Sequence, residues 1–541
     1  MTNHKFASQQ QLPSHISNRL QRSARCIYWF VMLVAFLFSA WILWLRLNSG
    51  LEISTPKFLL FNFLLIIATA LGLIYSKHRQ VKWLQSPKFL RVVLIGAIVL
   101  GIICRLAFML LAGEFQPIDA GTDTGVHYYA AQEILSTGHI QTEGTGVYEA
   151  YHTQLTSYTL LTTLCMKIFG VSYFAILIPN TIFDLLGALA IYLLLRRWQN
   201  EKAATIGVIF WLLNPLGIIF CAEILALTVV NALIAWVLYI IYLAYTSIMR
   251  QNYQTMLGLL VASSILSAVG NSLRPVFSII FIALTILIII QIIQRPQHYH
   301  VAWLLGGLVT FTVVFIGSGA LIERSYLIVN PHYHSEDVGH GALGWNLFVG
   351  ANYNTYGRWS LEDWELMSPR LYGGEMTPTE INSDFTRMAL ERYRQMSPGQ
   401  FTAHFVNKSK ILFCRNEITI IRNLEEQFTS VDGSERWYWF LNNSALINLT
   451  VFAVLTFTFF CFIFQKRKAR PDYFAFFLAL CFCGLLASSL LVEVMSRYVS
   501  IFLVPFVIFS SVAAYQLLQK FYSRHKVSCG SPTGLPTSTS A

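Results

Sequence analysis

Twelve runs of about 20 apolar residues each constrain this chain more than any other feature. Such a run is long enough to cross the hydrocarbon core of a membrane as a helix. Of the 541 residues, 55% are hydrophobic and only 12% are charged, whereas soluble chains average about 25% charged. We therefore predict an all-α integral membrane protein with about 12 transmembrane helices. The predicted spans are 26–47, 57–75, 91–112, 173–195, 203–222, 224–248, 256–273, 275–294, 301–322, 446–465, 472–492 and 498–519.

The net charge of +11 is explained by membrane orientation, and we do not expect the chain to bind nucleic acid. With the N-terminus in the cytoplasm, the clusters Arg196-Arg197 and Lys466-Arg467-Lys468 fall in cytoplasmic loops. A thirteenth apolar stretch, 158–170, is too short to span, and both clusters would face outward if it crossed. We therefore expect a multi-pass plasma-membrane protein with both termini in the cytoplasm, in which 158–170 forms a juxtamembrane helix on the outer surface.

Two of the predicted outer segments are large. The first, 113–172, is expected to be an extracellular catalytic loop with surface helices. The second, 323–445, holds 15 acidic and 11 basic residues, and the helical spacing from Glu380 to Tyr393 predicts a mainly helical extracellular subdomain. The other predicted parts are 1–112 with the cytoplasmic N-terminus and first three spans, 173–322 as the transmembrane core, 446–519 with the last three spans, and 520–541 as a disordered cytoplasmic tail.

Two carboxylates, Asp119 and Asp123, lie just past the outer end of the third predicted span. Asp123 precedes a stretch with helical spacing, so we place it at a helix N-terminus, where the partial positive charge favours an ionised carboxylate. A carboxylate at the membrane surface could act as a general base on an acceptor hydroxyl, or hold a divalent cation beside a phosphate. The alternative is that Asp123 only caps its helix.

Polar aromatic residues accompany these carboxylates. Tyr151 and Gln154 belong to a Tyr-rich stretch that precedes 158–170, and Tyr rings suit stacking against a sugar. Tyr is also the usual residue of a membrane interface. We assign both residues, together with His127 and Tyr128 of the acidic loop, to the candidate substrate-binding cavity.

No protein-built metal site or disulfide framework is predicted. The nine cysteines are scattered, and most lie in apolar runs. The His-rich segment 332–340 lacks the usual spacing of zinc ligands. A divalent cation at the acidic loop is therefore the one cofactor that the sequence leaves open.

Ionisable side chains inside the membrane are costly and usually face a cavity or a partner. Six such residues lie in the outer half of the predicted membrane or at outer helix ends, which predicts a polar cavity open to the outside. The planar guanidinium of Arg suits a phosphate, whereas Glu493 and Arg497, four residues apart, could simply pair with each other. The six are Arg105, Asp184, Glu223, Arg274, Glu493 and Arg497.

An ordered series of motifs across most of the chain resembles the GT-C superfamily of polytopic glycosyltransferases. This superfamily includes the protein O-mannosyltransferases, the lipid A aminoarabinose transferases and the RgtA-like enzymes. The matching elements are Asp123 with Tyr128 and Ala131, the surface helix ending in Phe169-Gly170, Arg196-Arg197, Asn214-Pro215, Glu223, Leu273-Arg274-Pro275, Arg497-Tyr498 with Pro505, and Gly344-Trp345-Asn346 through Gly350 and Asn352 to Gly357, Trp359 and Asp363.

The resemblance implies a GT-C-like fold and an inverting enzyme that uses a polyprenyl-phosphate-linked sugar as donor. By analogy, Asp123 would be the base or the carboxylate that orients the acceptor. Arg274 and Arg497 would hold the lipid phosphate, and Glu223 and Tyr498 would line the cavity.

The chain also departs from the superfamily's pattern. The Asp-Glu pair of the mannosyltransferases is Asp123-Thr124 here, so the second carboxylate is Asp119 or is absent. Two additional helices precede the core, which places the acidic loop after the third helix instead of the first.

The sequence therefore predicts a membrane hexosyltransferase that acts on a cell-surface acceptor (a wall polysaccharide or other glycan, a lipid or a protein) at the outer face. Two alternatives stay open. A transporter or flippase for a lipid-linked glycan should carry its key charges near the bilayer midplane. A glycan polymerase or ligase would share the outward cavity but use a diphosphate donor.

Overall fold

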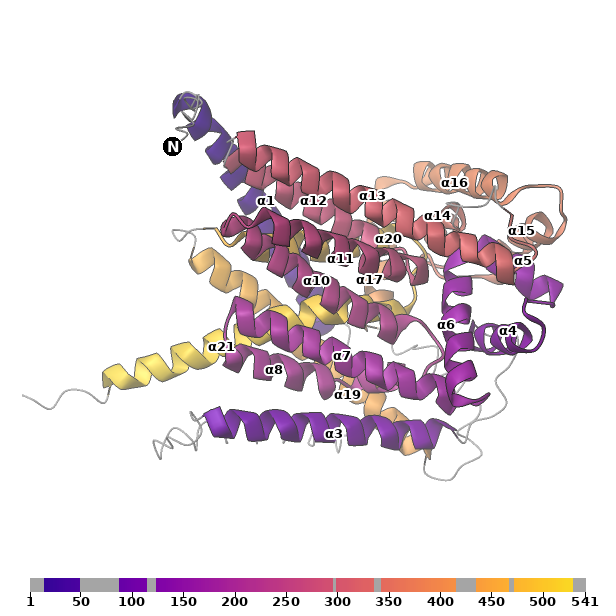
Figure 1. Cartoon of the computed structure of the whole chain (residues 1–541), viewed down its shortest axis with the longest axis horizontal. Helices are drawn as coiled ribbons and strands as arrows, with labels where there is room; N and C mark the ends of the chain where they lie inside the picture. Colours follow the sequence, from indigo (N-terminus) through magenta and orange to yellow (C-terminus); the bar gives the residue numbers. More distant parts are fainter. Residues whose placement is uncertain are drawn as a thin grey trace, which may run out of the picture.

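The chain folds into a bundle of long helices with a layer of shorter helices at one end (Figure 1). The computed structural model describes residues 14–48, 87–113, 123–294, 298–334, 342–414, 434–466 and 471–528. Every regular element in these ranges is a helix, in agreement with the predicted all-α class. Most of the long helices lie side by side along a common axis, and their apolar side chains form one large core.

Within these ranges, ten helices are long and apolar enough to cross a membrane, and a bent pair, α8 (Glu201–Leu212) with α9 (Pro215–Cys221), provides an eleventh candidate. Every predicted span has a counterpart except 57–75, which lies outside the described residues. The ten helices are α1 (Ser14–Asn48), α3 (Pro87–Gly113), α7 (Phe174–Trp198), α10 (Leu227–Met249), α11 (Tyr253–Leu273), α12 (Phe277–Gln294), α13 (His298–Val329), α19 (Ser434–Gln465), α20 (Tyr473–Leu491) and the continuous pair η3 (Ser496–Phe502) and α21 (Leu503–Ser528).

The break between α8 and α9 has a local cause. Pro215 has no N–H and favours the first turn of a new helix, which the Asn214 side chain caps by accepting from a backbone N–H at 3.1 Å. Arg105 of α3 donates to the carbonyl of Leu212 at 2.7 Å. This bond satisfies a carbonyl that the helix break leaves without an intrahelical partner. The same guanidinium forms an ion pair with Asp184 of α7 at 2.6 Å.

This ion pair changes the interpretation of the membrane charges. Arg105 is fully buried and Asp184 is 5% exposed, so each side chain is neutralised by the other inside the bundle. From the sequence, both residues were expected in one cavity shared by six ionisable residues. The structure instead gives them a structural role, because together they hold α3, α7 and the bent pair.

Short helices gather at one end of the bundle, which we call the capped end (Figure 1). Three of them are α4 (Asp123–Thr137), α5 (Glu143–Tyr151) and α6 (Thr153–Phe169). The α6 helix runs across the direction of the spans, as expected for the stretch 158–170 on the surface.

The second large predicted outer segment supplies the rest of this layer. It contains α14 (Leu343–Gly350), α15 (Leu361–Tyr372), α16 (Pro378–Gln395) and α17 (Pro398–Cys414), and we call residues 342–414 the cap subdomain. A capping box of Thr377 and Glu380 starts α16, which covers the predicted helical run. The subdomain has its own apolar core around Trp345, Phe348 and Phe385.

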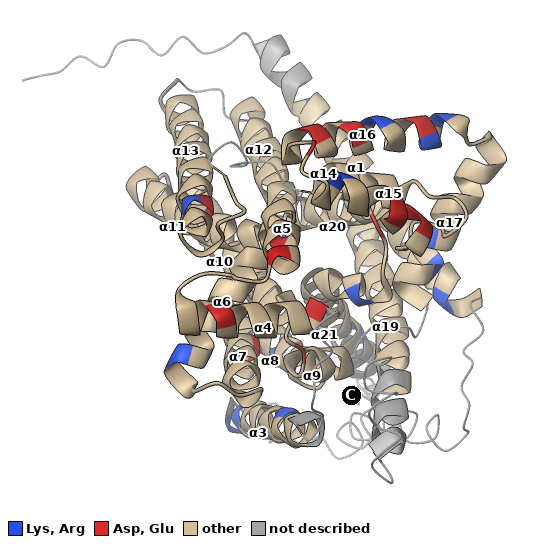
Figure 2. Cartoon of the chain, turned by 90° about the vertical axis from the view of Figure 1, so that its right-hand side faces the viewer, with Lys and Arg blue, Asp and Glu red and all other residues tan. Residues whose placement is uncertain are grey.

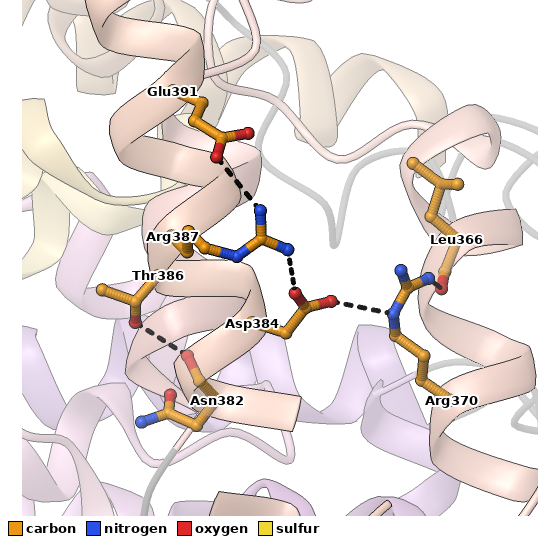
Figure 3. Close-up of polar contacts among 7 residues, drawn as sticks. All are labelled: Leu366, Arg370, Asn382, Asp384, Thr386, Arg387 and Glu391. Carbon is orange, nitrogen blue, oxygen red and sulfur yellow. Dashed lines mark hydrogen bonds and ion pairs between the residues drawn. The ribbon is translucent and has the colours of Figure 1, made fainter. Parts of the chain in front are cut away.

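A row of ion pairs joins α15 to α16 on the surface of the cap subdomain (Figure 3). Asp384 contacts Arg370 at 3.2 Å and Arg387 at 2.5 Å, and Arg387 also contacts Glu391 at 3.0 Å. The Arg387 side chain is 63% exposed, so water screens these contacts and each contributes little. The apolar core, not this row, stabilises the subdomain.

The motif that runs from Gly344-Trp345-Asn346 to Asp363 lies in the interior of the cap subdomain. The Asp363 side chain is fully buried and accepts hydrogen bonds from Asn352 at 2.8 Å and from Arg392 at 2.7 Å. Arg392 also donates to the carbonyl of Phe348 at 3.0 Å, and its guanidinium carbon lies 3.5 Å from the centre of that ring. The motif is therefore structural, because its one acidic side chain is fully used inside the subdomain.

Candidate active site

An ion pair at the capped end joins α4 to the start of the last span. Arg497 Nη2 lies 2.5 Å from Asp123 Oδ2. Asp123 is the first residue of α4, where the sequence places it, and Arg497 is the second residue of η3. Figure 2 looks onto this end, where charged residues are scattered over α15, α16 and the surface helices. The Asp123 side chain is 40% exposed, so it can contact a molecule arriving from water.

The cap subdomain positions the segment that leads into η3. Backbone N–H groups of Glu493 and Val494 donate to the carbonyls of Asn346 at 2.7 Å and Gly357 at 2.8 Å. Gly357 has a φ of +78°, which residues with a Cβ rarely adopt. These bonds place Glu493 beside the site and set the direction in which η3 begins.

Lys408 of α17 reinforces the same connection. Its ammonium is fully buried and donates to the carbonyls of Gly350 at 2.8 Å and Val492 at 2.6 Å. Burial lowers the pKa of Lys408 to about 7, against the opposing influence of Glu493. Lys408 thus ties the cap subdomain to the residue that precedes Glu493.

A second arginine reaches the site from the break between α11 and α12. Pro275 prevents α11 from continuing, and Arg274 is extended, with φ −160° and ψ 126°. Its guanidinium carbon lies 4.2 Å from the ring centre of Tyr498, and that of Arg497 lies 5.8 Å from the same ring. Two cations therefore meet at one aromatic side chain.

Glu493 and Arg497 do not pair with each other, although their spacing allowed it. Residues 496–502 form a 3₁₀-helix and 493–495 precede it outside any helix, so the four-residue spacing does not put the two side chains on one α-helical face. Arg497 contacts Asp123 instead, and a Glu493 oxygen accepts from the Tyr498 hydroxyl at 3.4 Å. Burial raises the pKa of Glu493, while Arg497 acts in the opposite direction.

A buried chain of hydrogen bonds runs from α4 through α6 to α5. His127 Nδ1 lies 3.0 Å from Thr159 Oγ1, and the Thr159 hydroxyl donates to Glu149 Oε1 at 2.7 Å. Glu149 is fully buried and His127 is 2% exposed. The sequence did not single out Glu149 or Thr159. The available signal was a carboxylate inside the Tyr-rich stretch, between Tyr148 and an apolar residue.

Aromatic rings extend the site toward the cap subdomain. Tyr148 lies 4.5 Å from His152 and 6.1 Å from Trp364 of α15, measured between ring centres. Burial raises the pKa of Tyr148, and the nearby charges of Asp123 and Glu493 raise it further. Tyr148 therefore lies within electrostatic reach of both acids, a position the sequence did not reveal.

The structure brings together six residues that the sequence singles out. Asp123, Arg274, Arg497 and Tyr498 form the contacts described above. Glu223 follows the bent pair, is 5% exposed and lies within electrostatic reach of Arg497. His127 lies one helical turn after Asp123 in the same helix.

Other predicted substrate-binding residues lie elsewhere. Tyr128 is buried in the main core, and Tyr151 packs in the core of the cap subdomain with Trp345. Gln154 is half-buried near the start of α6 and makes no side-chain hydrogen bond with another described residue. Asp119 lies outside the described residues.

The described ranges contain no preformed metal site, because no three His, Cys, Asp or Glu side chains converge there. His332 and His334 are described, whereas 335–341 and Asp119 are not. In the described part, positive charge at the site is supplied by Arg274 and Arg497. Guanidinium groups can bind a phosphate through paired hydrogen bonds.

No protein-family model and no curated protein matches the chain. Among solved structures, it is similar to the oligosaccharyltransferase AglB from Archaeoglobus fulgidus, in complex with an inhibitory peptide and a dolichol-phosphate, with 13% identity over 85% of this chain and 53% of that chain and a TM-score of 0.48. The chain thus spans about half the length of AglB. It is also similar to ArnT from Cupriavidus metallidurans bound to undecaprenyl phosphate, with 12% identity over 82% of each chain and a TM-score of 0.33.

Proposed function

We propose that this chain is a membrane glycosyltransferase that moves a sugar from a polyprenyl phosphate to an acceptor at the membrane surface. The observation that carries the proposal is the meeting of Asp123 with Arg497 and Arg274 at the capped end. A partly exposed carboxylate and two cations lie where the bundle of apolar spans ends. A donor with a lipid tail and a phosphate needs this combination, because its tail stays in the bilayer while its phosphate reaches the surface.

The two arginines hold the donor phosphate. Arg497 is 11% exposed and Arg274 is half-buried, so both act where little water screens them. Each can donate two hydrogen bonds to phosphate oxygens. Tyr498 keeps the Arg274 guanidinium in place, and we assign the buried Glu223, which lies within electrostatic reach of Arg497, to the sugar.

Asp123 orients the acceptor. Its carboxylate accepts the acceptor's hydroxyl proton as a hydrogen bond and directs the oxygen at the anomeric carbon. The new bond forms between this oxygen and the anomeric carbon as the bond to the phosphate oxygen breaks, and the electron pair leaves with the polyprenyl phosphate. Attack from the face opposite the phosphate inverts the anomeric centre. Arg274 and Arg497 stabilise the charge that develops on the leaving phosphate.

The ion pair found in the structure becomes part of this mechanism. Arg497 holds the pKa of Asp123 below its usual range and keeps it ionised. The guanidinium has further N–H donors for a phosphate, so Arg497 can bind the donor while it stays paired with Asp123. The carboxylate therefore stays ionised while it binds the acceptor hydroxyl.

We further propose that the capped end lies outside the cell and that both termini lie in the cytoplasm of a plasma-membrane protein. The α7 helix follows α6 at the capped end, so Arg196-Arg197 in its last turn lie at the opposite end of the bundle. Basic residues at that end are expected on the cytoplasmic side. The acceptor is then a cell-surface glycan, lipid or protein, and the transferred unit is a hexose or related sugar.

A transfer assay tests the proposal. The purified protein in lipid nanodiscs is mixed with a polyprenyl phosphate that carries a radiolabelled hexose and with surface glycan from a strain lacking the protein. We expect the label to move to the glycan, and Asp123→Asn to reduce transfer on the order of 10²-fold or more. Asp384→Asn, which removes a half-buried carboxylate on the surface ion-pair row of the cap subdomain, is the control and should retain activity.

The same assay separates the other functions. Unchanged transfer by Asp123→Asn would show that this carboxylate is not part of the chemistry. Movement of an intact lipid-linked glycan across a vesicle, with no new glycosidic bond, would identify a transporter. Activity with a diphosphate-linked donor and none with the monophosphate would identify a polymerase or ligase.

A further inference from the structure

We propose that His127, Thr159 and Glu149 form a buried proton relay, which takes the acceptor's proton away from the site. The inference rests on the proposed function, because transfer to a hydroxyl releases one proton for each sugar moved. His127 receives this proton, Thr159 passes it on and Glu149 accepts it. The three residues come from α4, α6 and α5, and two consecutive hydrogen bonds of 3.0 and 2.7 Å connect them.

Asp123 by itself is a weak final acceptor for this proton. Its carboxylate pairs with Arg497 at 2.5 Å, and that guanidinium lowers its pKa. A carboxylate stabilised in its ionised form orients a hydroxyl well but holds a proton poorly. A second acceptor close to Asp123 is needed, and His127 lies four residues later on the same face of α4.

The hydrogen bonds of the relay have a defined direction. An ionised carboxylate only accepts, so the Thr159 hydroxyl must donate to Glu149 Oε1. The Thr159 oxygen can then accept from His127 Nδ1–H, 3.0 Å away. This fixes the neutral His127 tautomer with its proton on Nδ1 and its basic lone pair on Nε2.

His127 can pass a proton on but cannot keep it. Burial lowers the pKa of His127 to about 4, so a second proton on the ring is unfavourable at neutral pH. When the acceptor proton binds Nε2, the Nδ1 proton moves to Thr159 Oγ1 and the original Thr159 proton moves to Glu149 Oε1. His127 and Thr159 end with as many protons as they began with, and Glu149 gains one.

Glu149 is suited to end the relay. It is fully buried, and its Oε2 has no hydrogen-bond partner within the described residues. Burial raises the pKa of Glu149 to about 7, which Glu133 reinforces and Thr159 opposes. A group with this pKa accepts a proton at neutral pH, and it can return the proton through Thr159 and His127 to water in the site once the product has left. The described titratable side chains on the elements around α5 include Asp123, His127 and Glu133 of α4, Tyr158 of α6, Tyr326 of α13 and Tyr372 of α15.

A packing role does not account for a carboxylate here. A buried ionised group is costly unless it is paired, and Glu149 has only hydroxyl partners. Gln would fill the same volume without that cost. An acid at this buried position therefore points to a use of its proton affinity.

The test is the pH dependence of sugar transfer by the full-length protein in nanodiscs. The relay requires ionised Glu149, so wild-type kcat/KM should fall about tenfold per pH unit below about pH 7. Glu149→Gln should lower transfer on the order of 10²-fold and remove this acid limb. Thr159→Val should behave in the same way, and Thr159→Ser, which restores the hydroxyl, should recover most of the activity.

Two controls separate the relay from damage to the fold. Glu143→Gln changes an exposed carboxyl of the same helix and should leave the profile unchanged. Binding of labelled polyprenyl phosphate should be the same in wild-type protein, Glu149→Gln and Thr159→Val, because the relay does not touch the donor. A wild-type protein without transfer activity would overturn the proposed function and the relay together. An active wild type with an acid limb that Glu149→Gln also shows, or a Thr159→Ser variant as impaired as Thr159→Val, would overturn the relay alone.

Discussion

Arg497 and Asp123 are 374 positions apart in the sequence, yet their side chains form an ion pair of 2.5 Å at the capped end. The contact fastens a surface helix to the first turn of the last span. It also places a partly exposed carboxylate directly beside a cation that can bind phosphate. The proposed chemistry depends on this pair more than on any other contact.

Replacing Arg497 should separate its contribution to donor binding from its effect on the pKa of Asp123. We expect Arg497→Ala to lower kcat/KM for the polyprenyl-phosphate donor by about 10²- to 10³-fold, because one donor to the leaving phosphate is lost. The pKa of Asp123 should also rise toward its usual value, since Arg497 is the main cause of its lowering. Any part of the pH–rate profile that reports Asp123 should therefore move to higher pH.

Arg497→Lys keeps the charge but loses the planar fork, so we expect only partial recovery. Arg387→Ala, on the exposed face of α16, is the control and should match wild type. Equal activity of Arg497→Ala and wild type would remove Arg497 from the mechanism.

Tyr498 should act through its ring. Tyr498→Phe keeps the aromatic face under Arg274, and we expect donor affinity within about twofold of wild type. Tyr498→Leu removes a cation–π contact worth about 1 kcal/mol, so its dissociation constant for polyprenyl phosphate should rise about fivefold. Equilibrium binding of labelled polyprenyl phosphate in nanodiscs measures both. A Phe variant as weak as the Leu variant would show that the hydroxyl bond to Glu493 matters more.

Glu149 should destabilise the protein at high pH. Its pKa is about 7 in the folded protein and 4.5 when unperturbed, so the folded state binds this proton more tightly. The contribution of Glu149 to the free energy of unfolding is therefore most favourable below about pH 4.5 and falls as the pH rises toward 7. Glu149→Gln should be more stable than wild type by up to about 3 kcal/mol at pH 8, and by much less at pH 5. Thermal unfolding in nanodiscs at the two pH values measures this difference. An equal shift at both pH values would contradict the assigned pKa.

The Arg105–Asp184 pair should behave as a structural contact. Replacing either partner alone leaves a buried charge unpaired, and we expect a loss of about 3–5 kcal/mol for Arg105→Leu or Asp184→Leu. The double variant should recover most of this loss, because neither charge is left. A double-mutant cycle of unfolding measures the coupling. A double variant that folds well but has lost sugar transfer would return these residues to the active site.

The cap subdomain should loosen when its buried ion pair is removed. Asp363→Ala leaves Arg392 and Asn352 without their shared partner, and we expect a local loss of about 2 kcal/mol. Hydrogen exchange should accelerate in α14 and α16 while the spans keep their protection. Glu362→Ala, at the adjacent exposed position, is the control. Faster exchange throughout the bundle would contradict a local role.

Much of the fold is predictable because the signals are local. A run of about 20 apolar residues spans a membrane wherever it occurs, so every predicted span in the described ranges has a helical counterpart. The short stretch 158–170 and the helical spacing after Glu380 likewise predicted α6 and α16. The start of α4 at Asp123 followed from the spacing of the residues after it.

Partners were not predictable in the same way. The four-residue spacing of Glu493 and Arg497 suggested a pair, but the local 3₁₀ geometry and the approach of α4 directed Arg497 to Asp123. The shared depth of six ionisable residues suggested one cavity, yet Arg105 and Asp184 neutralise each other. Hydropathy assigns a depth in the membrane to a side chain but does not say which neighbour it faces.

The sequence by itself determined that this chain is a helical membrane protein and which stretches form its long apolar helices, because length and apolar periodicity act over one helix at a time. The tertiary structure decided the chemistry at the capped end. The pairing of Asp123 with Arg497, the meeting of two arginines at Tyr498 and the chain from His127 to Glu149 join residues from separate helices. Such contacts depend on how helices pack and where they break, and no local pattern of residues records that.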